Sequence, residues 1–160
     1  FEDETDYVAG LLHNLGKLIL AITFPELFEK VYQKTHLDTE DFLEAERTTV
    51  GWDHAKIGAY YLWNHHISDE IVDAIHWHHE PLRSENHQKL SGAVQVADFI
   101  TSGLGVKGIV RQSSPAEKSH FELDGWRILF EGKSPQEMEI IEHGLKETVE
   151  RISQTLHGIL

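Results

Sequence analysis

Apolar residues recur at helical spacing along most of this chain. The first such stretch carries them at Val8, Leu11, Leu12, Leu15, Leu18, Ile19 and Ile22. Residues three and four positions apart lie on the same side of an α-helix. The pattern therefore predicts one helix over residues 5–22 with a buried apolar face.

Helix-starting and helix-breaking residues divide the rest of the chain into further helices. In chain order they are Pro25 at the start of a second helix, Asp38-Thr39 before a third, His54 at the start of a fourth, Ser68 before a fifth, and Pro81 at its end. A sixth helix is predicted over about 86–102 and a short one over 125–130. No alternating strand pattern of useful length is present. The prediction is one all-α domain over residues 1–160.

The C-terminal third of the chain begins with a stretch in which the helical pattern is weakest. Residues 103–122 are rich in Gly and Ser and are predicted to be a loop, with one strand-like turn at 108–110. Ser134-Pro135-Gln136-Glu137 is then a capping box that opens a long amphipathic helix. Its apolar stripe fits either a place in the core or a dimer interface, so a homodimer is one expectation.

The composition of the chain excludes several classes of function. The net charge of −13 repels nucleic-acid backbones, so nucleic-acid binding is not expected, although a small phosphorylated ligand is compatible with it. There are 0 Cys, so a thiolate metal site is excluded and a cytoplasmic location is expected. No apolar run reaches the roughly 18 residues of a membrane span, and no membrane association is expected. The 12 His are numerous, and several are adjacent in the chain.

Polar residues interrupt the apolar face of the first predicted helix. His13 and Lys17 are four positions apart and would share a face, with Asn14 beside them. Polar groups buried there need partners. A core histidine that is hydrogen-bonded to a backbone carbonyl is the alternative to a ligand role for His13.

Two further stretches carry imidazoles. In Asp53-His54-Ala55-Lys56-Ile57-Gly58, His54 begins a helix, Asp53 is a candidate cap, and Gly58 would let another helix approach closely. In His76-Trp77-His78-His79-Glu80-Pro81, consecutive imidazoles diverge by about 100° and can reach two sides of one metal cluster. His76 and His79 also share a face, so a different choice of ligands stays open. A favourable helix-dipole interaction explains one such histidine, but not the pair.

A carboxylate completes the set. Asp98 lies among apolar residues in the middle of the predicted helix over 86–102. It must be paired with a cation, hydrogen-bonded or bound to a metal. Imidazole and carboxylate are the usual ligands of Fe, Mn, Ni and Zn.

As an ordered set, these stretches resemble the HD superfamily of metal-dependent phosphohydrolases, and most closely the HDOD domains, which are bacterial signalling modules. The segments that carry the resemblance are Gly10-Leu11-Leu12-His13-Asn14-Leu15-Gly16-Lys17-Leu18, Asp53-His54 through Leu62, Ile71 through Pro81, and Val96-Ala97-Asp98. They span roughly residues 5–105.

The resemblance implies a helical bundle in which the four stretches converge on one pocket. Metal ligands would be His13, Asn14 in place of the family's aspartate, His54, His78, His79 and Asp98. Lys17, which matches the family's lysine, and Asp98 would be the catalytic residues. A divalent transition metal, Fe, Mn, Ni or Zn, is the implied cofactor.

Departures from the family pattern shape the functional hypotheses. Asn14 lacks the negative charge that would bridge two metal ions, so the binding of a second metal ion is weakened most. Pro81-Leu82-Arg83 stands where the cyclic-dinucleotide phosphodiesterases carry a Gly-Tyr-Pro loop. The N-terminal helices of the family are not in this sequence.

The favoured hypothesis is a catalytically degenerate regulatory domain that acts through a protein partner or a small phosphorylated ligand. The first alternative is an active metal-dependent phosphohydrolase. A helical scaffold whose histidines only pack is the second alternative. If a metal binds, its affinity should fall below about pH 6 as ordinary imidazoles protonate.

Overall fold

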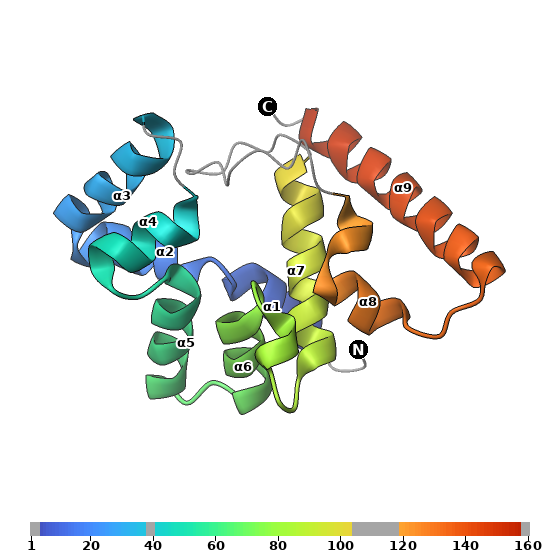
Figure 1. Cartoon of the computed structure of the whole chain (residues 1–160), viewed down its shortest axis with the longest axis horizontal. Coiled ribbons are helices and arrows are strands. Elements are labelled where there is room, and N and C mark those ends of the chain that lie inside the picture. Colours follow the sequence, from blue (N-terminus) through green and yellow to red (C-terminus); the bar gives the residue numbers. More distant parts are fainter. Residues whose placement is uncertain (1–3, 38–40, 104–118, 158–160) are drawn as a thin grey trace.

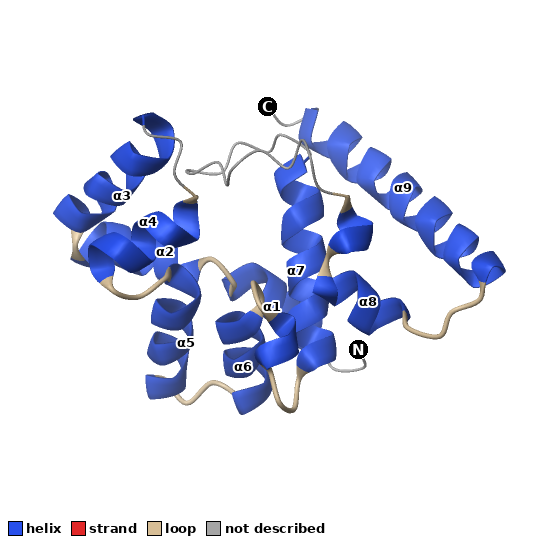
Figure 2. Cartoon of the chain, in the orientation of Figure 1, coloured by secondary structure: helices blue, strands red, loops and turns tan. Residues whose placement is uncertain are grey.

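The chain folds into a bundle of short helices arranged around α7 (Figure 1). We describe residues 4–37, 41–103 and 119–157 of a computed structural model. The helices are α1 (Thr5–Leu12), α2 (Leu15–Thr23), α3 (Pro25–Leu37), α4 (Phe42–Val50), α5 (His54–Asn64), α6 (Asp69–Trp77), α7 (Gln88–Gly103), α8 (Asp124–Phe130) and α9 (Pro135–His157), with single 3₁₀ turns η1 (Pro81–Arg83) and η3 (His120–Glu122). No strand occurs in the described residues (Figure 2), and the predicted all-α class is confirmed.

The first predicted helix is two helices in the structure. α1 ends at Leu12 and α2 begins at Leu15, so His13 and Asn14 form a turn and not a helix interior. The predicted apolar face is also only partly buried, since Leu11, Leu18 and Ile22 are 68%, 53% and 73% exposed. The apolar repeat predicted one continuous helix because a break of only two residues hardly disturbs a 3.6-residue period.

Three small clusters make up the core. One joins α1, α6 and α7 through Ala9, Ala74, Leu90 and Val94. Another joins α5 and α6 through Ala59, Leu62, Ile71 and Ile75. The third joins α3 and α4 through Val31, Phe42 and Ala45. The clusters surround the region where the predicted site residues meet.

Two glycines, Gly16 and Gly58, allow α2 and α5 to pack closely together. A Cβ on Gly16 would lie 1.9 Å from the His54 carbonyl oxygen, and one on Gly58 would lie 3.2 Å from the Gly16 backbone nitrogen. Only two residues without side chains permit this approach. The expected packing role of Gly58 is confirmed, and the contact sets the start of α5 beside the His13 turn.

Helix starts agree in part with the predictions. Asp53 caps α5 by accepting from the Lys56 amide at 2.9 Å. The capping box at α9 is present, with Ser134 and Glu137 each bonded to the other's backbone nitrogen. Asp41 caps α4, whereas the predicted cap Asp38-Thr39 lies outside the described residues. Ser68 precedes α6 without a side-chain cap bond.

The long C-terminal helix lies at one edge of the bundle (Figure 1). Met138, Ile141, Leu145 and Val149 of its apolar stripe are half-buried, while Ile140 is 73% exposed. The predicted strand-like turn at 108–110 lies outside the described residues. No single described helix has the length and apolarity to cross a membrane; the bent pair Thr5–Thr23 and Pro25–His36 meets that test on length and composition alone.

Candidate metal centre

Five of the predicted site residues come together where α1, α2, α5, α6 and α7 meet. The His78 ring centroid lies 5.3 Å from that of His13, 5.6 Å from that of His54 and 3.8 Å from that of His79. Asp98 Oδ1 lies 3.3 Å from His13 Nε2. Residues up to 85 positions apart in sequence thus share one small volume, as the sequence predicted.

Three imidazoles in this cluster have one nitrogen fixed by a hydrogen bond. His13 Nδ1 donates to the Gly10 carbonyl at 2.7 Å, and His78 Nδ1 donates to the Ile75 carbonyl at 2.6 Å. His54 Nδ1 lies 2.7 Å from Glu46 Oε2 and donates to it. A proton on Nδ1 leaves Nε2 with its lone pair free for a metal ion.

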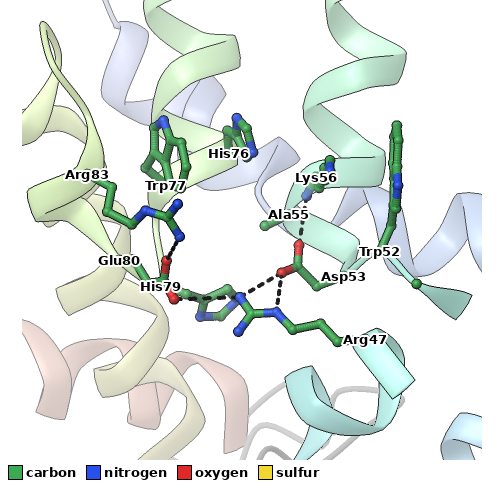
Figure 3. Close-up of a pocket in the computed structure, with 11 residues that line it drawn as sticks. Arg47, Trp52, Asp53, Ala55, Lys56, His76, Trp77, His79, Glu80 and Arg83 are labelled. Atoms are coloured by element: carbon green, nitrogen blue, oxygen red, sulfur yellow. Dashed lines mark hydrogen bonds and ion pairs between the residues drawn. The ribbon is translucent and has the colours of Figure 1, made fainter. Parts of the chain in front are cut away.

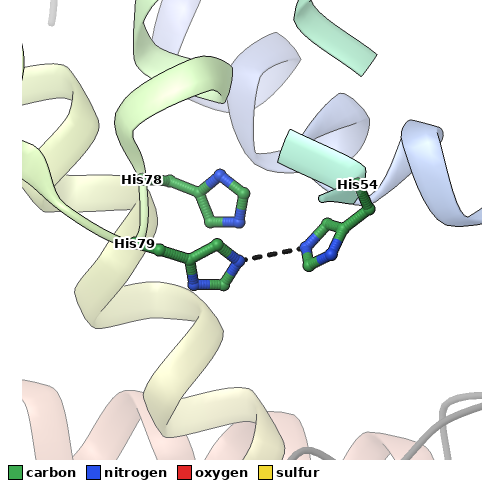
Figure 4. Close-up of side chains that lie close together, drawn as sticks. All are labelled: His54, His78 and His79. Atoms are coloured by element: carbon green, nitrogen blue, oxygen red, sulfur yellow. Dashed lines mark hydrogen bonds between the residues drawn. The ribbon is translucent and has the colours of Figure 1, made fainter. Parts of the chain in front are cut away.

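His54, His78 and His79 form the tightest group (Figure 4). One nitrogen from each lies within 4.8 Å of the other two, which is a spacing that one metal ion can bridge. His78 is fully buried, and its Nε2 has no hydrogen-bond partner among the described residues. His79 Nε2 lies 3.0 Å from His54 Nε2 and donates to it, because His54 carries its proton on Nδ1. A buried, unpartnered nitrogen beside two other imidazoles fits a divalent transition metal.

Burial keeps these imidazoles neutral. The pKa of His54 and the pKa of His78 are lowered well below their usual range, first by desolvation and then by neighbouring positive charge. Burial likewise lowers the pKa of His79 to about 4. Since a metal binds the neutral ring, the lowered pKa values favour metal binding at neutral pH, and an ion would replace the hydrogen bond between His79 and His54.

His13 and Asn14 are placed differently from the triad. Asn14 Nδ2 lies 2.6 Å from His13 Nε2 and donates to its lone pair. The Asn14 Oδ1 atom is buried without a hydrogen-bond partner in the described residues. The amide therefore occupies the very nitrogen of His13 that would bind an ion, which a carboxylate at this position would not do.

Two charged groups border the cluster. Burial alone would raise the pKa of Asp98, but the neighbouring His13, His78 and Lys17 lower it instead. The half-buried Lys17 has a lowered pKa because of desolvation, opposed by Asp98 and Glu46. Its Nζ lies 5.0 Å from the centre of the Phe42 ring. Both residues predicted to be catalytic thus lie at this site, and their roles stay predictions.

The sequence did not reveal Glu46. This residue is fully buried on α4, and Oε2 accepts from both the backbone nitrogen of His54 at 2.9 Å and its Nδ1. Oε1 has no hydrogen-bond partner in the described part of the chain. Desolvation raises the pKa of Glu46 to about 8, against the effect of the His54 backbone bond. The only signal available in the sequence was an acidic residue beside Ala45 on a half-apolar helix.

His76 does not join the triad, which settles the choice of face left open by the sequence. Its ring stacks on Trp77 with centroids 4.2 Å apart and an interplanar angle of 16°. Among the described residues, the group whose spacing could hold a metal ion consists of His54, His78 and His79.

Known proteins resemble this chain in sequence and in fold. A family model for the HDOD domain matches residues 2–81, which is half of the chain. An uncharacterized protein of Treponema pallidum (strain Nichols) is 30% identical over 99 residues, which cover 58% of this chain and 18% of that protein. The crystal structure of an HDOD domain protein with unknown function from Geobacter sulfurreducens matches with a TM-score of 0.78 at 20% identity. It covers 97% of this chain, which spans 53% of that structure's length. The chain belongs to the HDOD family.

Proposed function

We propose that this chain is a regulatory domain of bacterial signalling that binds one divalent transition metal ion and has lost strong hydrolase activity. The observation that supports metal binding is the fully buried His78 Nε2, unpartnered and within reach of His54 and His79. Membership of the HDOD family and the presence of Asn14 support a regulatory role over a catalytic one.

His54, His78 and His79 would hold the ion, and Glu46 would orient His54. A bound ion of this kind supplies Lewis acidity and lowers the pKa of a water molecule. Asp98 and Lys17 place one negative and one positive charge beside the triad. The amide of Asn14 adds no charge, so the site lacks the anionic bridge that would stabilise a second divalent ion.

The test of metal binding is a titration of chelator-treated protein with Mn²⁺, Ni²⁺ and Zn²⁺ by calorimetry. We expect one equivalent to bind and the variant H79A to bind it at least tenfold more weakly (~1.4 kcal/mol). H65A is the matched control, because His65 is exposed at the end of α5. Absence of stoichiometric binding, or equal losses in H79A and H65A, would contradict a site at the triad.

The second candidate function is a metal-dependent phosphohydrolase. Lys17 supports it, since an ammonium group beside a metal site can stabilise a phosphate group during reaction. The discriminating measurement is turnover of cyclic dinucleotides, nucleotides and a generic phosphodiester by metal-loaded protein. No turnover above buffer supports the regulatory proposal, whereas turnover that is lost in H79A would replace it with the enzyme.

A further inference from the structure

A pocket opens beside the metal centre and is lined in part by His79 (Figure 3). Its volume is about 390 Å³, which lies within the range of small-ligand sites in proteins. α4, α5, α6 and η1 contribute its lining, and all the lining residues belong to the described part of the chain. His79 therefore belongs both to this pocket and to the metal triad.

The pocket is locally cationic in an acidic chain. Arg47, Lys56 and Arg83 line it together with only two carboxylates, Asp53 and Glu80. The local charge is therefore three positive against two negative, whereas the whole chain carries −13. An excess of positive charge in a concave site favours a negatively charged ligand.

Tryptophan rings hold two of these cations in place. The Arg83 guanidinium lies 4.5 Å from the centre of the Trp77 ring, and Lys56 Nζ lies 4.3 Å from that of Trp52. Trp77 is itself stacked on His76. Surface cations are ordinarily mobile, and stacking on a fixed ring reduces the entropy that a ligand would have to remove.

The two guanidinium groups keep donors for a further acceptor. Arg47 uses Nε and Nη2 on Asp53 Oδ2, both at 2.8 Å, and Arg83 uses Nη1 on Glu80 Oε2 at 2.7 Å. Arg47 Nη2 and Glu80 Oε1 are 3.7 Å apart, too far for a hydrogen bond. Since a guanidinium has five N–H donors in a planar fork, each arginine can still bind an oxyanion.

We propose that this pocket binds a small oxyanion, either a phosphate or a carboxylate group, through the guanidinium groups of Arg47 and Arg83. The two carboxylates already in the pocket hold the arginines in the positions that the ligand requires. The proposal goes beyond the metal centre and does not depend on an ion being bound there. Arg47 directly follows Glu46 in the chain, and Glu80 directly follows His79. A ligand in the pocket therefore contacts segments that also carry the metal centre.

The test is calorimetric titration of the full chain in the presence of EDTA with inorganic phosphate and, separately, with succinate. EDTA makes the result independent of the metal site, so failure here and failure of metal binding are distinguishable. We expect saturable binding of at least one probe, weakened about tenfold in R83Q through loss of charge-assisted hydrogen bonds. The probe that binds more tightly identifies the oxyanion class.

R127Q is the matched control. Arg83 is 64% exposed and pairs with an acidic residue three positions away, and Arg127 is 70% exposed in the same kind of pair with Asp124 on α8. We expect R127Q to bind like the unmodified chain and R83K to bind several-fold more weakly, because lysine keeps the charge without the fork. Absence of saturation with both probes, equal losses in R83Q and R127Q, or full affinity in R83K would overturn the proposal.

Discussion

Glu46 and His54 form a fully buried pair in which one carboxylate oxygen receives two hydrogen bonds from the same residue. The bond to Nδ1 fixes the tautomer of His54, and the bond to the backbone nitrogen fixes the start of α5. Side chain and backbone of His54 are thus oriented by one acceptor. Such an orienting carboxylate commonly contributes 10–100-fold to the metal affinity of a site.

The first prediction concerns this pair. E46A should lower metal affinity by about 10–100-fold, because His54 loses the acceptor that keeps its proton on Nδ1. E46Q should lose less, since an amide oxygen still accepts a hydrogen bond from His54. Calorimetric titration gives the affinities, and ¹⁵N NMR of the histidine rings without metal reports the tautomer directly.

E44A provides the control for the Glu46 variants. Glu44 lies on the same helix, two positions earlier, and is exposed. Its removal should leave both the tautomer of His54 and the metal affinity unchanged. If E46A retained the Nδ1 tautomer and full affinity, Glu46 would have no positioning role.

The second prediction concerns stability at acidic pH without metal. The unfolded chain protonates His79 near pKa 6.5, whereas the folded chain does so only near a pKa of about 4. The unfolded state therefore binds more protons in this interval, and the free energy of unfolding should fall as the pH drops from 6.5 towards 4. His54 and His78 act in the same direction because burial lowers the pKa of each.

Urea denaturation of EDTA-treated protein at several pH values measures this loss, which is about 1.4 kcal/mol per pKa unit for each group that is shifted. The variant H79Q should show a shallower slope between pH 6.5 and 4. The pH at which protons compete with a bound metal should also lie below the value of about 6 that ordinary imidazoles suggest. A slope in H79Q as steep as that of the unmodified chain would contradict the lowered pKa of His79.

The third prediction concerns alkaline pH. The pKa of Glu46 is raised from 4.5 to about 8, so the folded state binds its proton more strongly than the unfolded state. Its contribution to stability is present below pH 4.5 and is lost as the pH rises through 8. Metal-free protein should accordingly lose thermal stability between about pH 6.5 and 8, and E46Q should lose less. Parallel melting curves for the two proteins would argue against a buried, protonated Glu46.

The residue types and their order along the chain allowed the site to be predicted, because few kinds of side chain bind a metal ion. Imidazoles and a buried aspartate inside apolar helices need partners. The resemblance to the HD superfamily, and not spacing alone, implied that these residues share one pocket. The break between α1 and α2 could not be predicted, because Asn14 and Gly16 interrupt a helical repeat without changing its period. Glu46 was missed since its partner His54 is fixed by a contact between α4 and α5 that local patterns do not encode.

The pocket was beyond sequence reasoning for a related reason. Arg47, Trp52 and Arg83 come from separate elements, and each alone is an ordinary surface residue. Only the fold, which places all three residues at one pocket, brings their charges and rings together. The presence of helices could be predicted from periodicity. The contacts between their side chains could not, because they depend on which helices pack together.

The fourth prediction concerns Asn14. N14D removes the amide that donates to His13 Nε2 and adds a negative charge beside the triad. Both changes favour cations, so metal affinity should rise, and a second equivalent should bind if His13 and Asp98 become available. N14A is the matched variant: it frees His13 without adding charge and should give a smaller gain. Unchanged stoichiometry and affinity in N14D would show that this position does not limit metal binding.

The fifth prediction concerns the glycine contact that holds α5 in place. A methyl group in G16A would lie 1.9 Å from the His54 carbonyl oxygen and 2.9 Å from the Gly58 nitrogen, and both neighbours are backbone atoms that cannot rotate away. α2 and α5 must separate, at a cost of at least the ~1–3 kcal/mol usual for overpacked cores. His54 moves with its backbone, so metal affinity should fall together with the free energy of unfolding.

G10A is the matched control for this substitution. Gly10 lies within α1, and a Cβ there would meet no atom within 4 Å. The added methyl group should stabilise the helix by ~0.5–1 kcal/mol, because alanine loses less conformational freedom than glycine on folding. Urea denaturation and metal titration of both variants separate a general effect of a helical alanine from a displaced α5. A G16A protein as stable and as metal-competent as G10A would mean that the approach of α2 to α5 does not position His54.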